Sequence, residues 1–374
     1  MKIICKQEKL IKALNIVSRA VSQTSPLPIT RGILIKTEGD TQASLQATDI
    51  QISIKTKTDA IVNEPGAIVV SARPIIDLVR KLPAGDILIA TDEKNKVSVK
   101  TDKSEYEYQG KDEGEFPRID IDEEGKKIKI DKEEIMDMID GTAFAASTDE
   151  SRGVITGVLF EIKDGTLSLA ALDGYRVAVR REKNKAYEES EIKAVVPARL
   201  MREMSKILAE STEEEEAIID IGDRRLLLFT EDTQIRVNLL EGDYIKYNDV
   251  IPKENRTKLL TGREDFLNAV ERAAMLKSEG KNAFIRVSIK DDGVMVSSRA
   301  EEGSGRESVA GEKSGENLEI GFDAKFLTDA LKAISDDTVE FQFNTSVSPC
   351  LIKPVEGDAF DYLILPVRLS TVSV

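Results

Sequence analysis

The chain has 374 residues, enough for two or three domains of ordinary size, and a 41% apolar fraction that allows a sizeable core. It has no histidine, which excludes the common Ser-His and Cys-His triads and most zinc sites, and its formal net charge is −15. No stretch approaches 18 apolar residues and the start, MKIICKQEKL, has no apolar signal core, so we expect a cytoplasmic protein with no membrane span.

The only two cysteines, Cys5 and Cys350, lie in apolar, strand-like runs and form no C-x-x-C pair. We therefore expect buried free thiols, with no metal site and no cofactor.

In chain order, the first predicted helix covers residues 8–21, where apolar residues recur at i, i+3, i+4 and i+7. Alternating runs at 31–39 and 43–57 predict antiparallel strands, and a second helix lies within VVSARPIIDLVRKL (69–82). More strands follow within residues 86–101. The order is therefore helix, strands, helix, strands.

The same order recurs twice along the chain. First helices are predicted at 132–145 and 264–276, and second helices lie within VVPARLMREMSKIL (195–208) and IGFDAKFLTDALKAI (320–334). Equivalent alanines, Ala72, Ala198 and Ala324, stand 126 residues apart. A period of this length is that of a domain and not of a solenoid unit.

The repeats predict three domains, residues 1–125, 126–253 and 254–374. Both junctions, GKDEGEFPRIDIDEEGKK and DVIPKENRTK, contain proline and few apolar residues, as linkers do. Runs of antiparallel strands with two helices per repeat indicate an α+β fold.

The second helix of each repeat has a predicted buried stripe and a helix-start residue. Ser71, Pro197 and Asp323 mark the starts. The stripe, at i, i+3 and i+7, consists of Ile75, Leu78, Leu82, Met201, Met204, Leu208, Leu327, Ala330 and Ile334.

Charge repeats on the same helices. The equivalent basic positions are Arg73, Arg199 and Lys325, then Arg80, Lys206 and Lys332, with the acids Asp77, Glu203 and Asp329 between them. From the residues alone, two interpretations stay open. One is a solvated face held by weak intrahelical ion pairs. The other is a shallow positive surface that meets phosphates.

Several motifs in order resemble the bacterial DNA polymerase III beta subunit family, the sliding clamps. They include SPLPITRGILI, ATDIQISI, FAASTDESRGVITGVLF, LDGYRVAV, VVPARLM, EGDYIKYNDVIP and YLILPVRL, and they cover the whole chain. The resemblance implies three clamp domains that form half of a closed ring. It further implies a non-enzymatic processivity factor, a head-to-tail homodimer around double-stranded DNA. Its partners would be the polymerase III catalytic subunit, the clamp loader and other proteins with a clamp-binding motif.

On the resemblance, three kinds of site residue are expected. The DNA-facing residues are Lys12, Thr24, Arg73, Arg80, Asp149, Arg199, Lys206, Lys325 and Lys332. The partner-peptide pocket comprises Ile155, Leu172, Gly174, Tyr175, Arg176, Val177, Val250, Leu363, Leu365, Pro366, Val367, Arg368 and Leu369, with Arg176 offering polar contacts. Met275 and Leu276 are expected at the dimer interface.

Two rival functions remain open. The net charge of −15 favours an acidic protein-interaction scaffold that never encircles DNA. An enzyme would need an acid pair such as Asp49 with Asp173, at equivalent strand ends, but a repeated acid there is more often turn chemistry.

Overall fold

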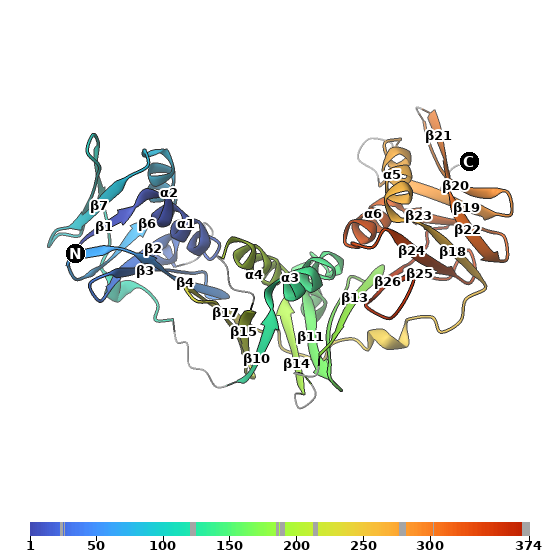
Figure 1. Cartoon of the computed structure of the whole chain (residues 1–374), viewed down its shortest axis with the longest axis horizontal. Coiled ribbons are helices and arrows are strands. Elements are labelled where there is room, and N and C mark those ends of the chain that lie inside the picture. The colour runs from blue at the N-terminus through green and yellow to red at the C-terminus, as the bar shows by residue number, and fades with distance from the viewer. Residues whose placement is uncertain are drawn as a thin grey trace. The chain divides into compact units, whose positions relative to one another are not determined.

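The computed structural model describes residues 1–22, 25, 27–119, 125–184, 187, 191–211, 216–276, 282–301 and 303–368 (Figure 1). Helices and antiparallel strands are mixed along this part of the chain, as the α+β prediction requires. The α-helices are α1 (Gln7–Ser18), α2 (Ala72–Lys81), α3 (Lys132–Asp140), α4 (Ala198–Glu210), α5 (Arg263–Ala274) and α6 (Ala324–Lys332).

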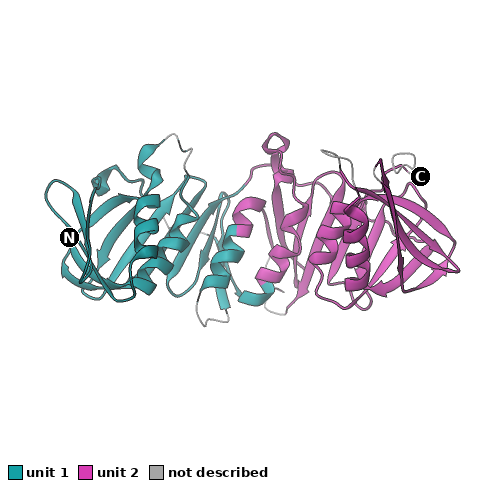
Figure 2. Cartoon of the chain, turned by 90° about the horizontal axis from the view of Figure 1, so that it is seen from above, with its two compact units in different colours: residues 1–134, 203–239 teal, residues 135–202, 240–374 magenta. Residues whose placement is uncertain are grey.

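The chain divides into two compact units (Figure 2). Unit 1 contains Met1–Glu134 and Glu203–Leu239, and unit 2 contains Ile135–Arg202 and Leu240–Val374. The division passes through α3 and α4, so the second predicted repeat contributes to both units. The domain boundaries at 125/126 and 253/254 stay a prediction.

Unit 1 contains two antiparallel sheets, with orders β5-β1-β7-β8-β9 and β10-β15-β16-β17-β4-β3-β2-β6. Helix α1 packs against α2 and against β3 and β4. The strands are β1 (Lys2–Lys6), β2 (Gly32–Glu38), β3 (Gln42–Thr48), β4 (Ile52–Asp59), β5 (Ile61–Glu64), β6 (Ala67–Ser71), β7 (Asp86–Thr91), β8 (Lys96–Lys100), β9 (Glu105–Gln109), β10 (Lys126–Asp131), β15 (Glu216–Ile221), β16 (Arg225–Phe229) and β17 (Thr233–Asn238).

Unit 2 repeats this plan, with orders β14-β11-β12-β13-β26-β25-β24-β18-β22 and β21-β20-β19-β23. Helix α5 packs against α6, β20 and β21. The strands are β11 (Gly157–Lys163), β12 (Thr166–Leu172), β13 (Arg176–Lys183), β14 (Ile192–Pro197), β18 (Thr257–Gly262), β19 (Phe284–Lys290), β20 (Gly293–Ala300), β21 (Gly303–Val309), β22 (Gly311–Gly315), β23 (Leu318–Asp323), β24 (Thr338–Phe343), β25 (Cys350–Pro354) and β26 (Phe360–Ile364).

In each unit, a strand of one repeat pairs with a strand of the next repeat, and this pairing joins the two repeats into one compact unit. In unit 1, β17 pairs with β4, from Thr233 opposite Thr56 to Val237 opposite Ile52. In unit 2, β26 pairs with β13 in the equivalent way, with Phe360 opposite Arg180. Each join turns two half-sheets into one ladder, so contacts cross the predicted repeat boundaries.

The second helices begin where the sequence predicts, immediately after Ser71, Pro197 and Asp323. Only the Asp323 side chain is seen to cap, accepting from the Lys325 N–H at 3.0 Å, whereas Ser71 makes no capping bond and Pro197 closes β14. The predicted stripe is buried throughout except for Leu78, which is half-buried.

The first helices are shorter than predicted. The predicted helix at 132–145 ends at Asp140, and a separate 3-10 turn covers Ala143–Ala145. Gly141 follows the helix, and the Thr142 hydroxyl donates to the Met138 carbonyl at 2.7 Å. Glycine lowers helix stability and a threonine hydroxyl competes with the backbone for hydrogen bonds, so the helix ends here although the apolar spacing continues.

The cysteine prediction is confirmed, because Cys5 and Cys350 are both buried free thiols. Burial, with a smaller contribution from Asp59, raises the pKa of Cys5 to about 12, so this thiol stays protonated and unreactive at neutral pH.

Candidate functional site

The repeated basic residues of α2, α4 and α6 lie on exposed helix faces. The exposed fraction of the side chain is 84% for Arg73, 68% for Lys325 and 55% for Lys206. Arg80, Arg199 and Lys332 are exposed as well. The described cations therefore stand on the face opposite the buried stripe, where a phosphate could reach them.

The intervening acids hold these cations loosely. Arg73 lies 3.9 Å from Asp77, and Lys325 lies 2.5 Å from Asp329. Lys332 instead pairs with Glu271 of α5 at 2.7 Å. Because these three cations are themselves more than half exposed, such pairs contribute at most about 1 kcal/mol, and Arg73, Lys325 and Lys332 stay available to another anion.

Glu203 on α4 is the most enclosed of the three acids, and two cations share it. Lys206 donates to it at 2.9 Å and Arg19, just after α1, donates at 3.0 Å. Burial on its own would raise the pKa of Glu203, but the hydrogen bonds from Lys206 and Arg19 outweigh burial and lower it. Glu203 therefore stays ionised in the folded protein at neutral pH.

Three predicted DNA-facing residues differ from the helix cations. Lys12 is half-buried and lines a cavity of about 230 Å³ between α1 and the strands β4 and β17. The Asp149 carboxylate accepts hydrogen bonds from the Ser151 hydroxyl at 2.7 Å and the Ser151 N–H at 3.0 Å, which lower the pKa of Asp149. Thr24 lies outside the described residues.

The LDGYRVAV motif forms a tight turn between β12 and β13. Asp173 accepts from the N–H groups of Tyr175 at 2.9 Å and Arg176 at 3.1 Å. Gly174 has φ of +91°, a conformation that favours glycine. Asp49 makes the equivalent bonds to Gln51 and Ile52, so both acids of the rival enzyme pair are turn acceptors.

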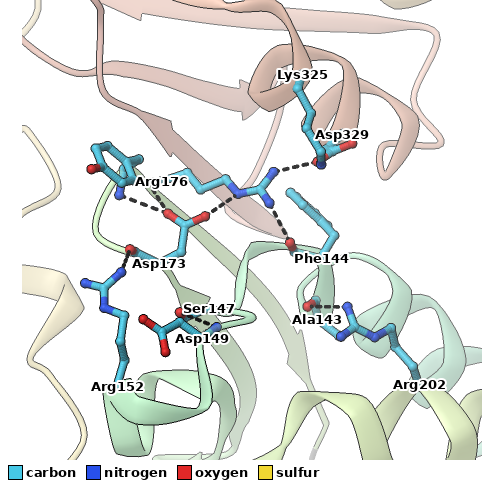
Figure 3. Close-up of polar contacts among 11 residues, drawn as sticks. Ala143, Phe144, Ser147, Asp149, Arg152, Asp173, Arg176, Arg202, Lys325 and Asp329 are labelled. Atoms are coloured by element: carbon cyan, nitrogen blue, oxygen red, sulfur yellow. Dashed lines mark hydrogen bonds and ion pairs between the residues drawn. The ribbon is translucent and has the colours of Figure 1, made fainter. Parts of the chain in front are cut away.

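Arg176 is enclosed by contacts within the protein (Figure 3). Its Nε donates to Asp173 at 3.0 Å, its Nη1 to Asp329 at 2.7 Å and its Nη2 to the Phe144 carbonyl at 2.8 Å. The guanidinium also lies over the rings of Phe144 and Phe326, at 5.3 and 4.7 Å from their centroids. In this structure Arg176 therefore anchors the turn, and its polar contact with a partner peptide stays a prediction.

The structure brings four predicted pocket residues, Ile155, Leu172, Val177 and Leu363, into one buried hydrophobic cluster. Tyr244 and Tyr247 belong to the same cluster but were not predicted as site residues, although EGDYIKYNDVIP is one of the family motifs. Phe144 and Phe326 were also missed, because nothing in their local sequence indicates that they flank an arginine.

Exposed apolar side chains lie beside this cluster in the chain. The exposed fraction is 60% for Tyr175, 51% for Val250 and 36% for Leu365. The Leu365 N–H donates to the Tyr175 carbonyl at 2.8 Å, and the Val367 N–H donates to Gly321 at 2.8 Å. Pro366 and Val367 are half-buried, Arg368 is exposed, and Leu369 lies outside the described residues.

Met275 and Leu276 follow the end of α5. Met275 is 79% exposed, the highest value among the large apolar side chains described as exposed, and it lines a surface pocket of about 560 Å³. The Leu276 side chain is close to Gly305 of β21, since a Cβ built on that glycine would come within 3.1 Å of Leu276 Cδ1. Leu276 therefore stands beside the β21 edge, whereas Met275 shares its pocket with Ala324, Lys325 and Thr328 of α6.

Repeated two-helix modules with exposed cationic helices and joined sheets are the architecture of a DNA clamp. Models of the N-terminal, central and C-terminal domains of the DNA polymerase III beta subunit match residues 1–120, 129–246 and 248–368. The chain belongs to the DNA polymerase III beta subunit family.

Individual relatives agree along the full length. The beta sliding clamp of Halalkalibacterium halodurans is 33% identical, over 98% of this chain and 100% of that protein. The sliding clamp structure from Bacillus subtilis has a TM-score of 0.93 at 30% identity, covering 98% and 99% of the two chains. A putative DNA polymerase III beta subunit from Eubacterium rectale has a TM-score of 0.92 at 32% identity, covering 99% and 100%.

Within the described residues, every helix is too short or too polar to cross a membrane.

Proposed function

We propose that this chain is half of a DNA sliding clamp, a non-catalytic processivity factor for DNA replication. Two copies would close head to tail into a ring around double-stranded DNA in the cytoplasm. The ring would hold the DNA polymerase III catalytic subunit on its template and would be placed there by the clamp loader. Membership in the DNA polymerase III beta subunit family supports this function.

The repeated sheet join is the observation that carries the ring. The chain uses it twice, as β17 with β4 and as β26 with β13. In the 126-residue repeat, β9 corresponds to β17 and β26, and β21 corresponds to β4 and β13. Both β9 and β21 are edge strands of their sheets. Because an edge strand leaves backbone groups unpaired, β9 of one copy can make the same join with β21 of another, and doing so at both ends closes a two-chain ring.

Met275 and Leu276 suit this dimer contact. Leu276 stands next to β21, and its chain neighbour Met275 has the large apolar exposure expected of a residue that a partner covers. On β9, Tyr106 is 44% exposed and offers an apolar surface of similar size. We propose that these residues pack together across the join.

The proposed DNA-facing residues contribute attraction without a tight grip. Ion pairs with neighbouring acids reduce the net charge of each helix face, and phosphate contacts are weakened further by salt. A closed ring stays on DNA by topology, so weak contacts favour sliding. The proposed set comprises Arg73, Arg80, Arg199, Lys206, Lys325 and Lys332, with Lys12, Thr24 and Asp149 carried over from the family resemblance.

Tyr175, Val250 and Leu365, with the cluster below them, support a site for a short apolar peptide of the partner proteins. An apolar wall with a few backbone polar groups is typical of such sites. The first repeat lacks this wall: when the equivalent turn acids Asp49 and Asp173 are aligned, Leu172 and Val177 correspond to Thr48 and Ser53, whose hydroxyls bond each other at 2.7 Å. We therefore expect no equivalent site in the first repeat, and we propose that all partners share the site in unit 2.

The acidic scaffold remains the second candidate, favoured by the net charge of −15. DNA topology separates the two functions. The protein is loaded by its clamp loader onto nicked circular DNA, and part of the DNA is then linearised. Gel filtration separates the DNA from free protein and measures how much protein stays with each DNA form.

A ring stays with the circle, slides off the linear form, and is retained again when both DNA ends carry bulky protein blocks. A scaffold shows the same retention on all three substrates, and that result would exclude the clamp.

A further inference from the structure

A single carboxylate oxygen on α6 joins the two proposed binding regions (Figure 3). Asp329 Oδ2 accepts from Lys325 Nζ at 2.5 Å and from Arg176 Nη1 at 2.7 Å. The two cations differ greatly in environment, because the Lys325 side chain is 68% exposed and the Arg176 side chain is 8% exposed. Lys325 can therefore leave Asp329 for a solution anion, whereas Arg176 cannot.

Arg176 in turn holds the turn that presents Tyr175. Its guanidinium binds Asp173, the residue whose carboxylate also accepts from the Tyr175 N–H. The Tyr175 ring stacks on Phe326 of α6, with centroids 6.1 Å apart and planes 20° apart. A change in how firmly Arg176 binds Asp329 therefore changes how well ordered the exposed Tyr175 side chain is.

The turn is also held from the other side. Arg152, in the segment Glu150–Thr156, donates a short hydrogen bond from Nη1 to the Asp173 carbonyl. This segment directly follows Asp149, which the family resemblance places near DNA. Two elements proposed to face DNA thus converge on the same four-residue turn, Asp173–Arg176.

We propose that Asp329 is a positioning residue that couples DNA contact at Lys325 to peptide binding at the Asp173–Arg176 turn. The inference rests on the DNA face and the peptide site proposed above. When a phosphate draws Lys325 away, the repulsion between the two cations on Asp329 Oδ2 is relieved and Arg176 binds that oxygen more firmly. The turn becomes better ordered, and a peptide then loses less conformational entropy on binding.

Coupling between two binding equilibria is reciprocal, so a bound peptide raises DNA affinity by the same factor. Because Lys325 is exposed, we expect an effect of about fivefold, the low end of measured couplings. Because the coupling is positive, the clamp would bind partner peptides more tightly when it is on DNA.

Lys332 provides a matched control on the same helix. Its side chain is 58% exposed, close to that of Lys325, but its ion pair is with Glu271, and Asp329 has only the smallest electrostatic effect on it. Lys325→Met and Lys332→Met each remove one cation from α6, so both should weaken DNA binding to a similar extent. Only the Lys325 change should affect the turn.

The test measures peptide affinity by fluorescence anisotropy with and without a saturating short duplex. The probe is a fluorescein-labelled fragment of the DNA polymerase III catalytic subunit, chosen as the tightest binder from an overlapping set. With wild-type protein, duplex should lower the peptide Kd about fivefold. Without DNA, Lys325→Met should bind the peptide as tightly as the wild type does with duplex, and adding duplex should not lower its Kd further. Lys332→Met should respond to duplex like the wild type.

Asp329→Asn should weaken peptide binding and abolish the response to duplex. Lys325→Arg keeps the cation and should behave like the wild type. An equal response to duplex in the wild type and all variants, or no response in the wild type, would overturn the coupling and leave the peptide site in place. If no fragment binds the wild-type chain, the proposed peptide site fails and the coupling fails with it.

Discussion

At the scale of the residue, Arg176 has the largest part in shaping the candidate peptide site. Three of its nitrogens bind acceptors within unit 2, and two aromatic rings enclose its guanidinium. A buried ion pair adds little net stability compared with apolar packing, but losing one partner leaves an enclosed charge unpaired. The arginine therefore specifies one conformation of the turn.

Arg176→Met should destabilise unit 2. It keeps the apolar stem of the side chain but removes the cation that Asp173 and Asp329 share, and of these two acids only Asp329 keeps a cation, Lys325. Because Asp329 is one-quarter exposed, we expect a loss of about 2–4 kcal/mol, slightly below the usual value for a broken buried pair. Denaturant unfolding measures this loss.

Lys183→Met, on the same strand, removes an exposed pair with Asp358 and should cost less than about 0.5 kcal/mol. Equal effects of the two substitutions would show that Arg176 is not a structural anchor.

The turn itself could be predicted from the sequence, because the Asp-Gly pair specifies both the acceptor and the positive φ. The role of Arg176 could not, because its partner Asp329 lies 153 residues away in the chain. Local sequence does not reveal which distant carboxylate meets an arginine, and an isolated arginine after a turn looks like an exposed donor.

At the scale of the element, the second helices combine a buried stripe with an exposed cationic face. The apolar spacing predicted the stripe, and only Leu78 is less buried than expected. The ends of the first helices were harder to predict, since Gly141 and the Thr142 back-bond end α3 while apolar residues continue. When the apolar spacing continues from a helix through a following 3-10 turn, it does not show where the helix ends.

Reversing charge on these faces tests their role. Arg73→Glu, Arg199→Glu and Lys325→Glu together should lower loading onto nicked circular DNA by about tenfold or more, because each change turns a phosphate attraction into a repulsion. Sedimentation should still show the dimer.

The control carries the same change in net charge on strands, with Lys36→Glu, Lys129→Glu and Lys290→Glu. These lysines are exposed and pair with acids in the same way as the helix cations. If both triple variants load equally poorly, net charge and not the helix face controls loading.

At the scale of the whole molecule, the repeat provides the fold and is the basis of the proposed assembly. The 126-residue period could be read from the sequence, and with it the α+β class and the number of helices per repeat. The pairing of β4 with β17 could not be predicted, because these strands lie far apart in the chain and an alternating apolar pattern does not indicate which strand is the partner. Once the two internal joins are known, the free edges of β9 and β21 follow.

The head-to-tail ring makes a specific prediction about mixtures of two damaged chains. Met275→Asp with Leu276→Asp spoils the β21 side, and Tyr106→Asp spoils the β9 side, so each variant alone should be monomeric. In a head-to-tail assembly each contact uses one side from each chain, and an equimolar mixture therefore has one intact contact.

The most direct measurement is sedimentation velocity of the wild type, of each variant, and of their mixture at equal total concentration. The ring predicts dimers for the wild type, monomers for each variant alone, and recovered dimers in the mixture. A mixture that stays monomeric, or variants that stay dimeric on their own, would contradict closure through β9 and β21.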